Sequence, residues 1–161
     1  MSPFHLQAYS ISASQGGVVR NNLAEDLVYG FYHDIGSIFD ASIHHNKFLR
    51  CPRGVFFNIG TTTAVFQRNI LIQDNLIESP PDHPETYGIL FGNNNLSEIH
   101  NVSILRNRIQ ARTGIRFDSV LPITGVRILT NVIDAAVPWS LNNVQAPVIL
   151  DNQNSAGQAI H

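Results

Sequence analysis

The stretch from Ile99 to Asp118 carries a hydrophobic pattern that the rest of the chain repeats. Apolar and polar residues alternate with period 2 before an asparagine, after it, and again after a glycine. The positions that define the pattern are Ile99, Val102, Ile104, Asn107, Ile109, Gly114, Ile115 and Phe117. Because period 2 is the signature of β-strands and not of helices, the pattern predicts three short strands in each copy.

Further copies align on six asparagines, of which the last belongs to a decayed copy. They are Asn21, Asn46, Asn75, Asn107, Asn131 and Asn152. The intervals between them are 25, 29, 32, 24 and 21 residues, whereas every clear copy keeps an apolar residue three positions before the asparagine and another two positions after it. Constant segments separated by variable gaps are typical of strands joined by loops. We therefore expect an all-β fold, a right-handed, single-stranded parallel β-helix (a β-solenoid) of about six coils, with the hand taken from the strong preference of parallel crossovers.

The recurring asparagine has a physical reason. The chain must bend sharply between two strands, and asparagine tolerates the left-handed backbone region of such bends better than any residue except glycine. Asparagines stacked at one corner can also hydrogen-bond to one another as a ladder. We expect the glycine before each third strand to serve a second corner through its own backbone freedom. The side chains expected to be buried at the ladder corner are Asn46, Asn75, Asn107 and Asn131.

Stacked coils place equivalent apolar residues above one another inside the solenoid. One expected inner line precedes the asparagine, a second follows it, and a stack of phenylalanines follows the glycine. The predicted core residues are Val18, Ile43, Ile72, Ile104 and Ile128; Phe48, Ile77, Ile109 and Ile133; and Phe57, Phe91 and Phe117.

This Ile-x-Ile-x-x-Asn-x-Ile coil resembles the right-handed parallel β-helix of the pectate-lyase-like superfamily, which includes pectate lyases, related polysaccharide hydrolases and epimerases, and phage tailspikes. The resemblance covers residues 16 to 152 and is one of fold, because the chain matches no catalytic signature of a particular member. It implies a polysaccharide as partner and a location outside the cell or on a virion surface. The calcium-binding aspartate cluster of pectate lyases is not evident, so we expect no cofactor, although calcium is the ion that the resemblance would imply.

We expect one domain over residues 1–161, with an irregular start or cap at 1–15, repeat coils at 16–152 and a tail at 153–161. A helical turn from Leu23 to Leu27 is an alternative within the first coil. No amphipathic helix is available as a lid, and open solenoid ends expose core side chains and strand edges. Asn154 stands where the repeat would place isoleucine. Either the last coil frays, or the chain is a piece of a longer β-helix, or a partner, including a second copy through self-association, covers the ends.

Bulk composition narrows the class of protein. A chain of 161 residues with 43% hydrophobic content can form one continuous core. Ten basic and 12 acidic residues give a net charge of −2, so nothing indicates binding to nucleic acid. No apolar run is long enough to span a membrane, and the N-terminus lacks a signal-peptide pattern.

The single cysteine, Cys51, excludes an intramolecular disulfide. Arg50 and Arg53 nearby could lower its pKa, whereas a buried structural thiol is the commoner case.

Outward positions form lines along the solenoid, in which neighbours lie about 4.8 Å apart. The position just before the asparagine reads Arg20, His45, Asp74, Arg106, Thr130 and Asp151. His45, Asp74 and Arg106 would set a base, a carboxylate and a cation side by side, and they are the candidate catalytic residues. His44 and Glu78, just outside this line, are candidate binding residues. The alternative interpretation is a solvated sheet face of alternating charge, in which each pair stabilises the fold by about 0.2–1 kcal/mol.

A second outward line, on the third strand of each coil, reads Phe56, Leu90 and Arg116. Exposed apolar side chains there would suggest contact with a sugar ring or a neighbouring protein, and Tyr29, Tyr32 and Tyr87 could add stacking surface. We take Arg116 and Tyr87 as candidate binding residues.

The loop between Ile77 and Gly88 contains three prolines, which predicts a stiff and extended segment. Its Asp82, His83 and Glu85 could bind a metal, but their spacing matches no metal motif, and exposed loop residues are the alternative interpretation. Since this is the one long loop and the chain has fewer coils than members of the family usually have, the leading hypothesis is a carbohydrate-associated module that binds or scaffolds polysaccharide. The alternative is a polysaccharide lyase or glycoside hydrolase acting on a surface groove.

Overall fold

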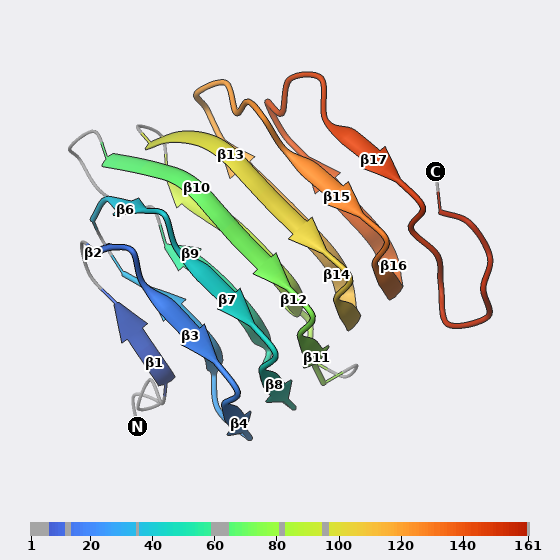
Figure 1. The fold of residues 1–161 in the computed structure, drawn as a ribbon. Coiled ribbons are helices and arrows are strands. Elements are labelled where there is room, and N and C mark those ends of the chain that lie inside the picture. The colour runs from blue at the N-terminus through green and yellow to red at the C-terminus, as the bar shows by residue number, and fades with distance from the viewer. Residues whose placement is uncertain are drawn as a thin grey trace.

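The computed structural model describes residues 7–11, 14–34, 36–58, 65–80, 83–94 and 97–160. Within these ranges the chain contains no helix, and its strands pair in parallel in two sheets that curl around one axis (Figure 1). Sheet A consists of β1 (Gln7–Ile11), β4 (Leu23–Glu25), β5 (Tyr29–His33), β8 (Lys47–Leu49), β9 (Arg53–Asn58), β11 (Leu76–Glu78), β12 (Tyr87–Asn94), β14 (Arg108–Ser119) and β16 (Val132–Leu141). Sheet B consists of β2 (Ser14–Gln15), β3 (Val18–Arg20), β6 (Ile38–Phe39), β7 (Ser42–His44), β10 (Val65–Gln73), β13 (Ser97–Leu105), β15 (Arg127–Leu129) and β17 (Val148–Leu150). The predicted parallel β-helix is confirmed.

Each coil runs along sheet B, turns at an asparagine, and returns along sheet A. In the third coil, for example, β10 leads to the turn at Asn75, and β11 and β12 follow. The register keeps equivalent residues opposite one another, so that Ile72 pairs with both Ile43 and Ile104. We call the turn at the asparagine the asparagine corner, and the turn between the two sheet A segments of a coil the loop corner.

The asparagine ladder is present and buried. Asn46, Asn75, Asn107 and Asn131 are at most 2% exposed, as predicted. The backbone N–H and the side-chain Nδ2 of each asparagine both donate to the Oδ1 of the asparagine in the next coil, over 2.9–3.1 Å. The same Nδ2 also donates to the carbonyl of an inner sheet B residue, such as Ile72 for Asn107, at 2.9 Å. The ladder therefore fixes the corner from inside.

The first coil corrects the predicted register by one residue. Asn22, not Asn21, joins the ladder by donating to Asn46 Oδ1. Accordingly Val19 is buried, while the predicted core residue Val18 is 59% exposed. The doublets Val18–Val19 and Asn21–Asn22 fit the repeat in two registers, and a slip of one residue exchanges the inner and outer faces of a strand.

The left-handed residue of the corner is the one before the ladder asparagine, so the backbone reason given for the asparagine is wrong. This residue has φ between +50° and +57° in every coil, and the residues are Asn21, His45, Asp74, Arg106, Thr130 and Asp151. The ladder asparagine is selected by its buried hydrogen bonds instead, because only a side chain with both a donor and an acceptor can link coils in this way.

The expected core is otherwise confirmed. The inner isoleucines and Phe48 are at most 1% exposed. Phe57, Phe91 and Phe117 stack with ring centroids 4.3 and 4.8 Å apart and planes within 6° of parallel. His33 and Leu141 continue this line in register at either end. Gln67 interrupts another inner line, between Ile38 and Ile99, and both polar atoms of its buried side chain lack a hydrogen-bond partner.

The glycines before the third strands do not adopt the left-handed conformation that we predicted. Gly30, Gly54, Gly88 and Gly114 lie within sheet A strands, stacked so closely that an added Cβ would meet the carbonyl oxygen of the residue in the next coil at 2.6–2.7 Å. Glycine is therefore required by the close approach of backbones and not by a turn.

The loop corner changes from coil to coil. Asp26 and Arg50 turn the first two coils in the left-handed conformation. The third coil leaves the sheet after Ser79 and rejoins it at Thr86, while β14 and β16 bend round the corner as continuous strands. Residues 23–27 contain β4 and the turn at Asp26, so the alternative of a helical turn there is wrong.

The tail does not fray within the described residues. Asn154 begins a turn in which its Oδ1 accepts hydrogen bonds from the backbone N–H groups of Ala156 and Gln158. The chain then returns antiparallel, with Gln153 bridged to Ala159, and Ile160 packs against the core. The tail therefore forms a small hairpin beyond the last coil (Figure 1).

Candidate functional site

The line at the asparagine corner brings His45, Asp74 and Arg106 together. The left-handed backbone of all three turns their side chains out at the same point of successive coils. Arg106 binds the Asp74 carboxylate with two hydrogen bonds of 2.9 Å, and His45 Nε2 lies 4.0 Å from Asp74 Oδ2, one of the two oxygens that accept from Arg106. Arg20, predicted in the line, lies instead on β3 in register with His44.

The charges along this line keep the Asp74 carboxylate ionised at neutral pH. The hydrogen bond and the charge of Arg106 hold the pKa of Asp74 below its usual value, so this carboxyl cannot act as a general acid near neutral pH. His45 and Arg106 are 56% and 54% exposed, and Asp74 25%. The line therefore lies on an open corner, where bound water competes for every polar contact.

The two other residues predicted near this line lie on either side of the corner. His44 ends β7, and its Nδ1 is 2.8 Å from Nδ1 of His45. Glu78 lies on β11, after the corner, in register with Leu49 and Gln110. The row of ionisable groups is thus His44, His45, Asp74 and Arg106, without Glu78.

Arg116 and Tyr87, the remaining predicted binding residues, do contact each other. Arg116 donates to the Tyr87 hydroxyl at 3.1 Å and to Asp118 at 2.7 Å, and its guanidinium lies 5.5 Å from the Tyr87 ring centroid. They line a hollow of about 220 Å³ on the outer face of β9, β12 and β14, which we call the arginine–tyrosine hollow. Its lining residues are Arg53, Phe56, Glu85, Tyr87, Leu90, Gly92, Arg116 and Asp118.

Phe56 and Leu90, the apolar residues of the outward line, border this hollow but are buried, so the line is not the exposed apolar surface that would suggest contact with a sugar ring or a protein. Tyr29, Phe56 and Leu90 are only 6%, 3% and 8% exposed, and they form a small cluster outside the main core. The guanidinium of Arg53 covers two of these rings, at 5.5 Å from Tyr29 and 5.3 Å from Phe56. Tyr87 and Tyr32, which are half-buried, are the rings of the cluster that remain accessible.

Paired charges line the rim of the hollow. Arg53 donates to the Tyr29 hydroxyl at 2.8 Å and to Glu85 at 3.4 Å. Burial on its own would lower the pKa of Arg116, but the hydrogen bond and charge of Asp118 outweigh it and the pKa is raised. The hollow thus offers two guanidinium groups and two carboxylates around a phenol, which can donate and accept hydrogen bonds from one ligand.

Arg53, Glu85 and Asp118 are residues that the sequence reasoning did not assign to this surface. Arg53 had a usable signal, because it precedes Gly54 as Tyr87 precedes Gly88, and the two pair in register. Glu85 had none, since the position of a loop residue does not follow from a repeat.

The loop between Ile77 and Gly88 lies at the surface, whereas the Cys51 thiol is buried. Asp82 lies outside the described residues, while the His83 ring accepts a hydrogen bond from the Glu85 backbone. No group of three His, Cys, Asp or Glu side chains that could hold a metal occurs in the described ranges. Cys51 is buried, which raises the pKa of its thiol, and Arg50 turns away to Asp26 and Glu25.

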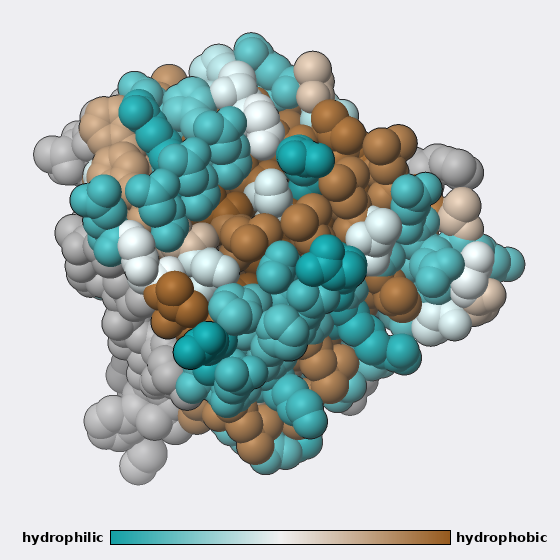
Figure 2. Space-filling model, in the orientation of Figure 1, coloured by the Kyte–Doolittle hydropathy of each residue, from teal (hydrophilic) through white to brown (hydrophobic). Residues whose placement is uncertain are grey.

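Sheet B presents a different face, shown in Figure 2, where apolar side chains gather over the region of β13, β15 and β17. Leu105, Leu129 and Leu150 lie in register there, and Leu150 is 57% exposed. In the described part of the chain, no helix is long and apolar enough to cross a membrane.

Scans against family models, curated proteins and solved structures found no match to this chain. What the chain does must therefore be inferred from its own surface.

Proposed function

We propose that the chain is a carbohydrate-associated β-helix module that binds polysaccharide at the arginine–tyrosine hollow. The observation that carries the proposal is the pairing of the accessible Tyr87 ring with the Arg116 guanidinium in a hollow rimmed by charged side chains. A sugar ring has an apolar face that can pack on an aromatic ring and hydroxyls that need both donors and acceptors. The hollow supplies both kinds of contact.

The resemblance of the coil to the pectate-lyase-like superfamily supports the same proposal. Through its Ile-x-Ile-x-x-Asn-x-Ile coil and asparagine ladder, the chain resembles the right-handed, pectate-lyase-like β-helices that act on or bind polysaccharides. A module of this kind would work outside the cell or on a virion surface. The repeat itself suits a polymer, because coils that recur along the axis present equivalent positions to successive sugar units.

The alternative proposal is a polysaccharide lyase or glycoside hydrolase using His45, Asp74 and Arg106. The adjacency of the three side chains favours it. Binding is the stronger proposal because His45 and Arg106 are exposed and the Asp74 carboxylate is already paired with Arg106, whereas catalytic groups are usually tuned by burial in a cleft.

The test is retention of the protein on neutral and acidic polysaccharides, with product formation followed in parallel. We expect Tyr87→Ala and Arg116→Gln to weaken retention at least about tenfold, and Tyr87→Phe, which keeps the ring, to lose less. Arg127→Gln, on the exposed face of sheet B, is the matched control. Unsaturated products or new reducing ends that disappear in His45→Asn or Asp74→Asn would establish the enzyme instead. Neither retention nor turnover would leave a purely structural solenoid.

We propose self-association as a second property, on the observation of the leucine row of sheet B, in which Leu150 is exposed and Leu105 and Leu129 are half-buried. Light scattering at rising concentration should show a dimer or larger species that Leu150→Lys disrupts. A monomer at all concentrations contradicts it.

A further inference from the structure

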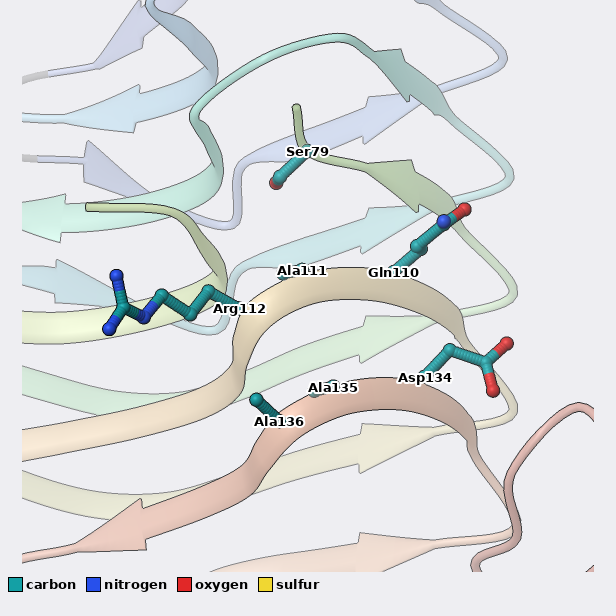
Figure 3. A pocket seen from close by; sticks show the side chains of 7 residues that line it. All are labelled: Ser79, Gln110, Ala111, Arg112, Asp134, Ala135 and Ala136. Carbon is teal, nitrogen blue, oxygen red and sulfur yellow. The ribbon is translucent and has the colours of Figure 1, made fainter. Parts of the chain in front are cut away.

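A second hollow, of about 500 Å³, lies at the loop corner (Figure 3). It is lined by Ser79, Gln110, Ala111, Arg112, Asp134, Ala135 and Ala136. Figure 3 shows Gln110 and Asp134 projecting to one side of the bent strands and Arg112 to the other. We call it the corner hollow.

The corner hollow follows from the change in the loop corner. β11 of the third coil ends at Glu78 and β12 begins at Tyr87, and the described residues between them, 79–80 and 83–86, form no strand above β14. Where β14 and β16 bend round the corner, they carry alanines, of which Ala111 and Ala135 pack against the main core and Ala136 is exposed. The side chain that the hollow exposes at this bend is therefore a single methyl group.

Hydrogen bonds hold the walls of this hollow in place. Ser79 donates its backbone N–H to Gln110 at 2.8 Å, and Arg112 donates its own to the Thr86 hydroxyl at 2.9 Å. The Arg112 side chain also reaches Pro84 O at 3.3 Å. The site is therefore preformed, which reduces the entropy cost of binding.

The polar groups of the corner hollow balance in charge. Arg112 is a cation, and the backbone hydrogen bond from Ser155 keeps the pKa of Asp134 below its usual value, so that this carboxylate is an anion. Asp134 would repel an anionic ligand, and Arg112 would repel a cationic one. Ser79 and Gln110 add an uncharged hydroxyl and amide. An uncharged ligand with hydroxyls around an apolar face fits this arrangement.

We propose that the corner hollow is a binding site for a neutral sugar, one or two units long. The exposed methyl group of Ala136 would face the C–H groups of the ring, while Gln110, Arg112 and Asp134 would bind its hydroxyls. The volume lies within the range of about 300–1,000 Å³ that small-ligand sites occupy. The site is distinct from the arginine–tyrosine hollow, because the two hollows have no lining residue in common, and it does not rest on the proposed function.

The experiment titrates the protein with neutral mono- and disaccharides and, separately, with uronic acid and amino sugar analogues of the same size. Amide NMR shifts report the position, and Trp139, the single tryptophan, reports from three residues beyond Ala136 on β16. We expect shifts at residues 110–112 and 134–136 with neutral sugars only. Ala136→Leu, at an exposed position that should fold normally, should weaken binding at least about tenfold, whereas Arg127→Gln should change it less than about twofold.

Three results would overturn the proposal: no shift at roughly 20 mM sugar, equal affinity for charged analogues, or undiminished binding by Ala136→Leu. Failure here and failure of the proposed function are distinguishable. Retention that is lost in Tyr87→Ala and intact in Ala136→Leu would leave the polysaccharide proposal standing alone.

Discussion

The two corners of the solenoid obey different rules. At the asparagine corner, every coil turns with the same backbone geometry, whatever the outer residue is, from His45 to Thr130. At the loop corner, the first two coils turn at Asp26 and Arg50, the third leaves the sheet, and the next two bend as continuous strands. The chain therefore fixes one corner strictly and lets the other vary.

Buried polar groups explain the difference. Inside the asparagine corner, each ladder side chain links three strands by hydrogen bonds that no water could replace. In the described part of the loop corner there is no buried ladder that runs from coil to coil, and the cross-coil pair of Arg50 with Asp26 is exposed to solvent. A corner without such a ladder can accept a loop, and both hollows border the residues that flank that loop. The asparagine corner, which is the same in every coil, stabilises the fold, whereas the loop corner, which varies, provides the surface at which a ligand could bind.

The largest expected effect on stability comes from removing a ladder asparagine at the asparagine corner. Asn107→Ala removes the acceptor of two bonds from Asn75 and the donor to Ile72 O, leaving buried groups unpaired. We expect a loss of about 3 kcal/mol or more in the free energy of unfolding, measured by urea denaturation. Asn101→Gly, at an exposed left-handed position where Asn101 donates to Asn69 Oδ1 in an outer row, should cost no more than about 0.5 kcal/mol. Equal losses in the two variants would show that burial is not what fixes the corner.

The next effect tests the close approach of backbones at the glycine line. In Gly88→Ala, the new Cβ would meet Gly114 O at 2.6 Å, and a carbonyl within a sheet cannot move aside. Overpacking should cost about 1–3 kcal/mol and lower the thermal midpoint. Gly92→Ala is the control, because its Cβ would meet the movable end of Leu90 at 2.8 Å, so the loss should be smaller. A Gly88→Ala protein as stable as the wild type would mean that coil spacing is adjustable.

A gain in stability is expected inside sheet B. Gln67 is fully buried with no hydrogen-bond partner for either polar atom, between positions that hold Ile38 and Ile99. Gln67→Met has a similar shape and no such groups, so the free energy of unfolding should rise by about 1 kcal/mol. Gln73→Met, on the outer face of the same strand, should be close to neutral. A loss in Gln67→Met would indicate that the amide is satisfied in solution, for instance by an internal water.

The sequence predicted the inner lines because they repeat. An apolar residue at a fixed distance from each asparagine indicates an inward position that stacks from coil to coil. Phe57, Phe91 and Phe117 stack as expected. The first coil failed where two adjacent asparagines made the pattern ambiguous. The backbone roles of asparagine and glycine were misassigned because composition alone does not distinguish a left-handed turn from a buried hydrogen bond or a close contact.

The candidate surfaces were predicted only in part. The repeat predicted that Asp74 lies beside Arg106 and that Arg116 lies on the strand next to that of Tyr87, because equivalent residues of neighbouring coils must align. It could not show that Phe56 is covered by Arg53, or that a hollow lies at the loop corner. Those features depend on side-chain conformations and on loop length, which no repeat determines.

The smallest expected effect concerns the outer line of the asparagine corner. Because Arg106 lowers the pKa of Asp74 in the folded protein, the ionised carboxylate stabilises the fold above its unfolded-state pKa of about 3.9, and this stabilisation is lost as the pH falls through the lower folded-state value. Asp74→Asn keeps a residue that tolerates the left-handed backbone but removes the charge. The wild type should therefore exceed Asp74→Asn by about 0.2–1 kcal/mol near pH 7, and the difference should vanish once the pH has fallen below the lowered folded-state pKa of Asp74. Urea denaturation across this range measures it, with Asp151→Asn, at the equivalent position of the last coil beside Thr130, as the control. If the difference is zero at every pH, the pair adds nothing to the fold, and the adjacency of His45, Asp74 and Arg106 would then need a functional explanation.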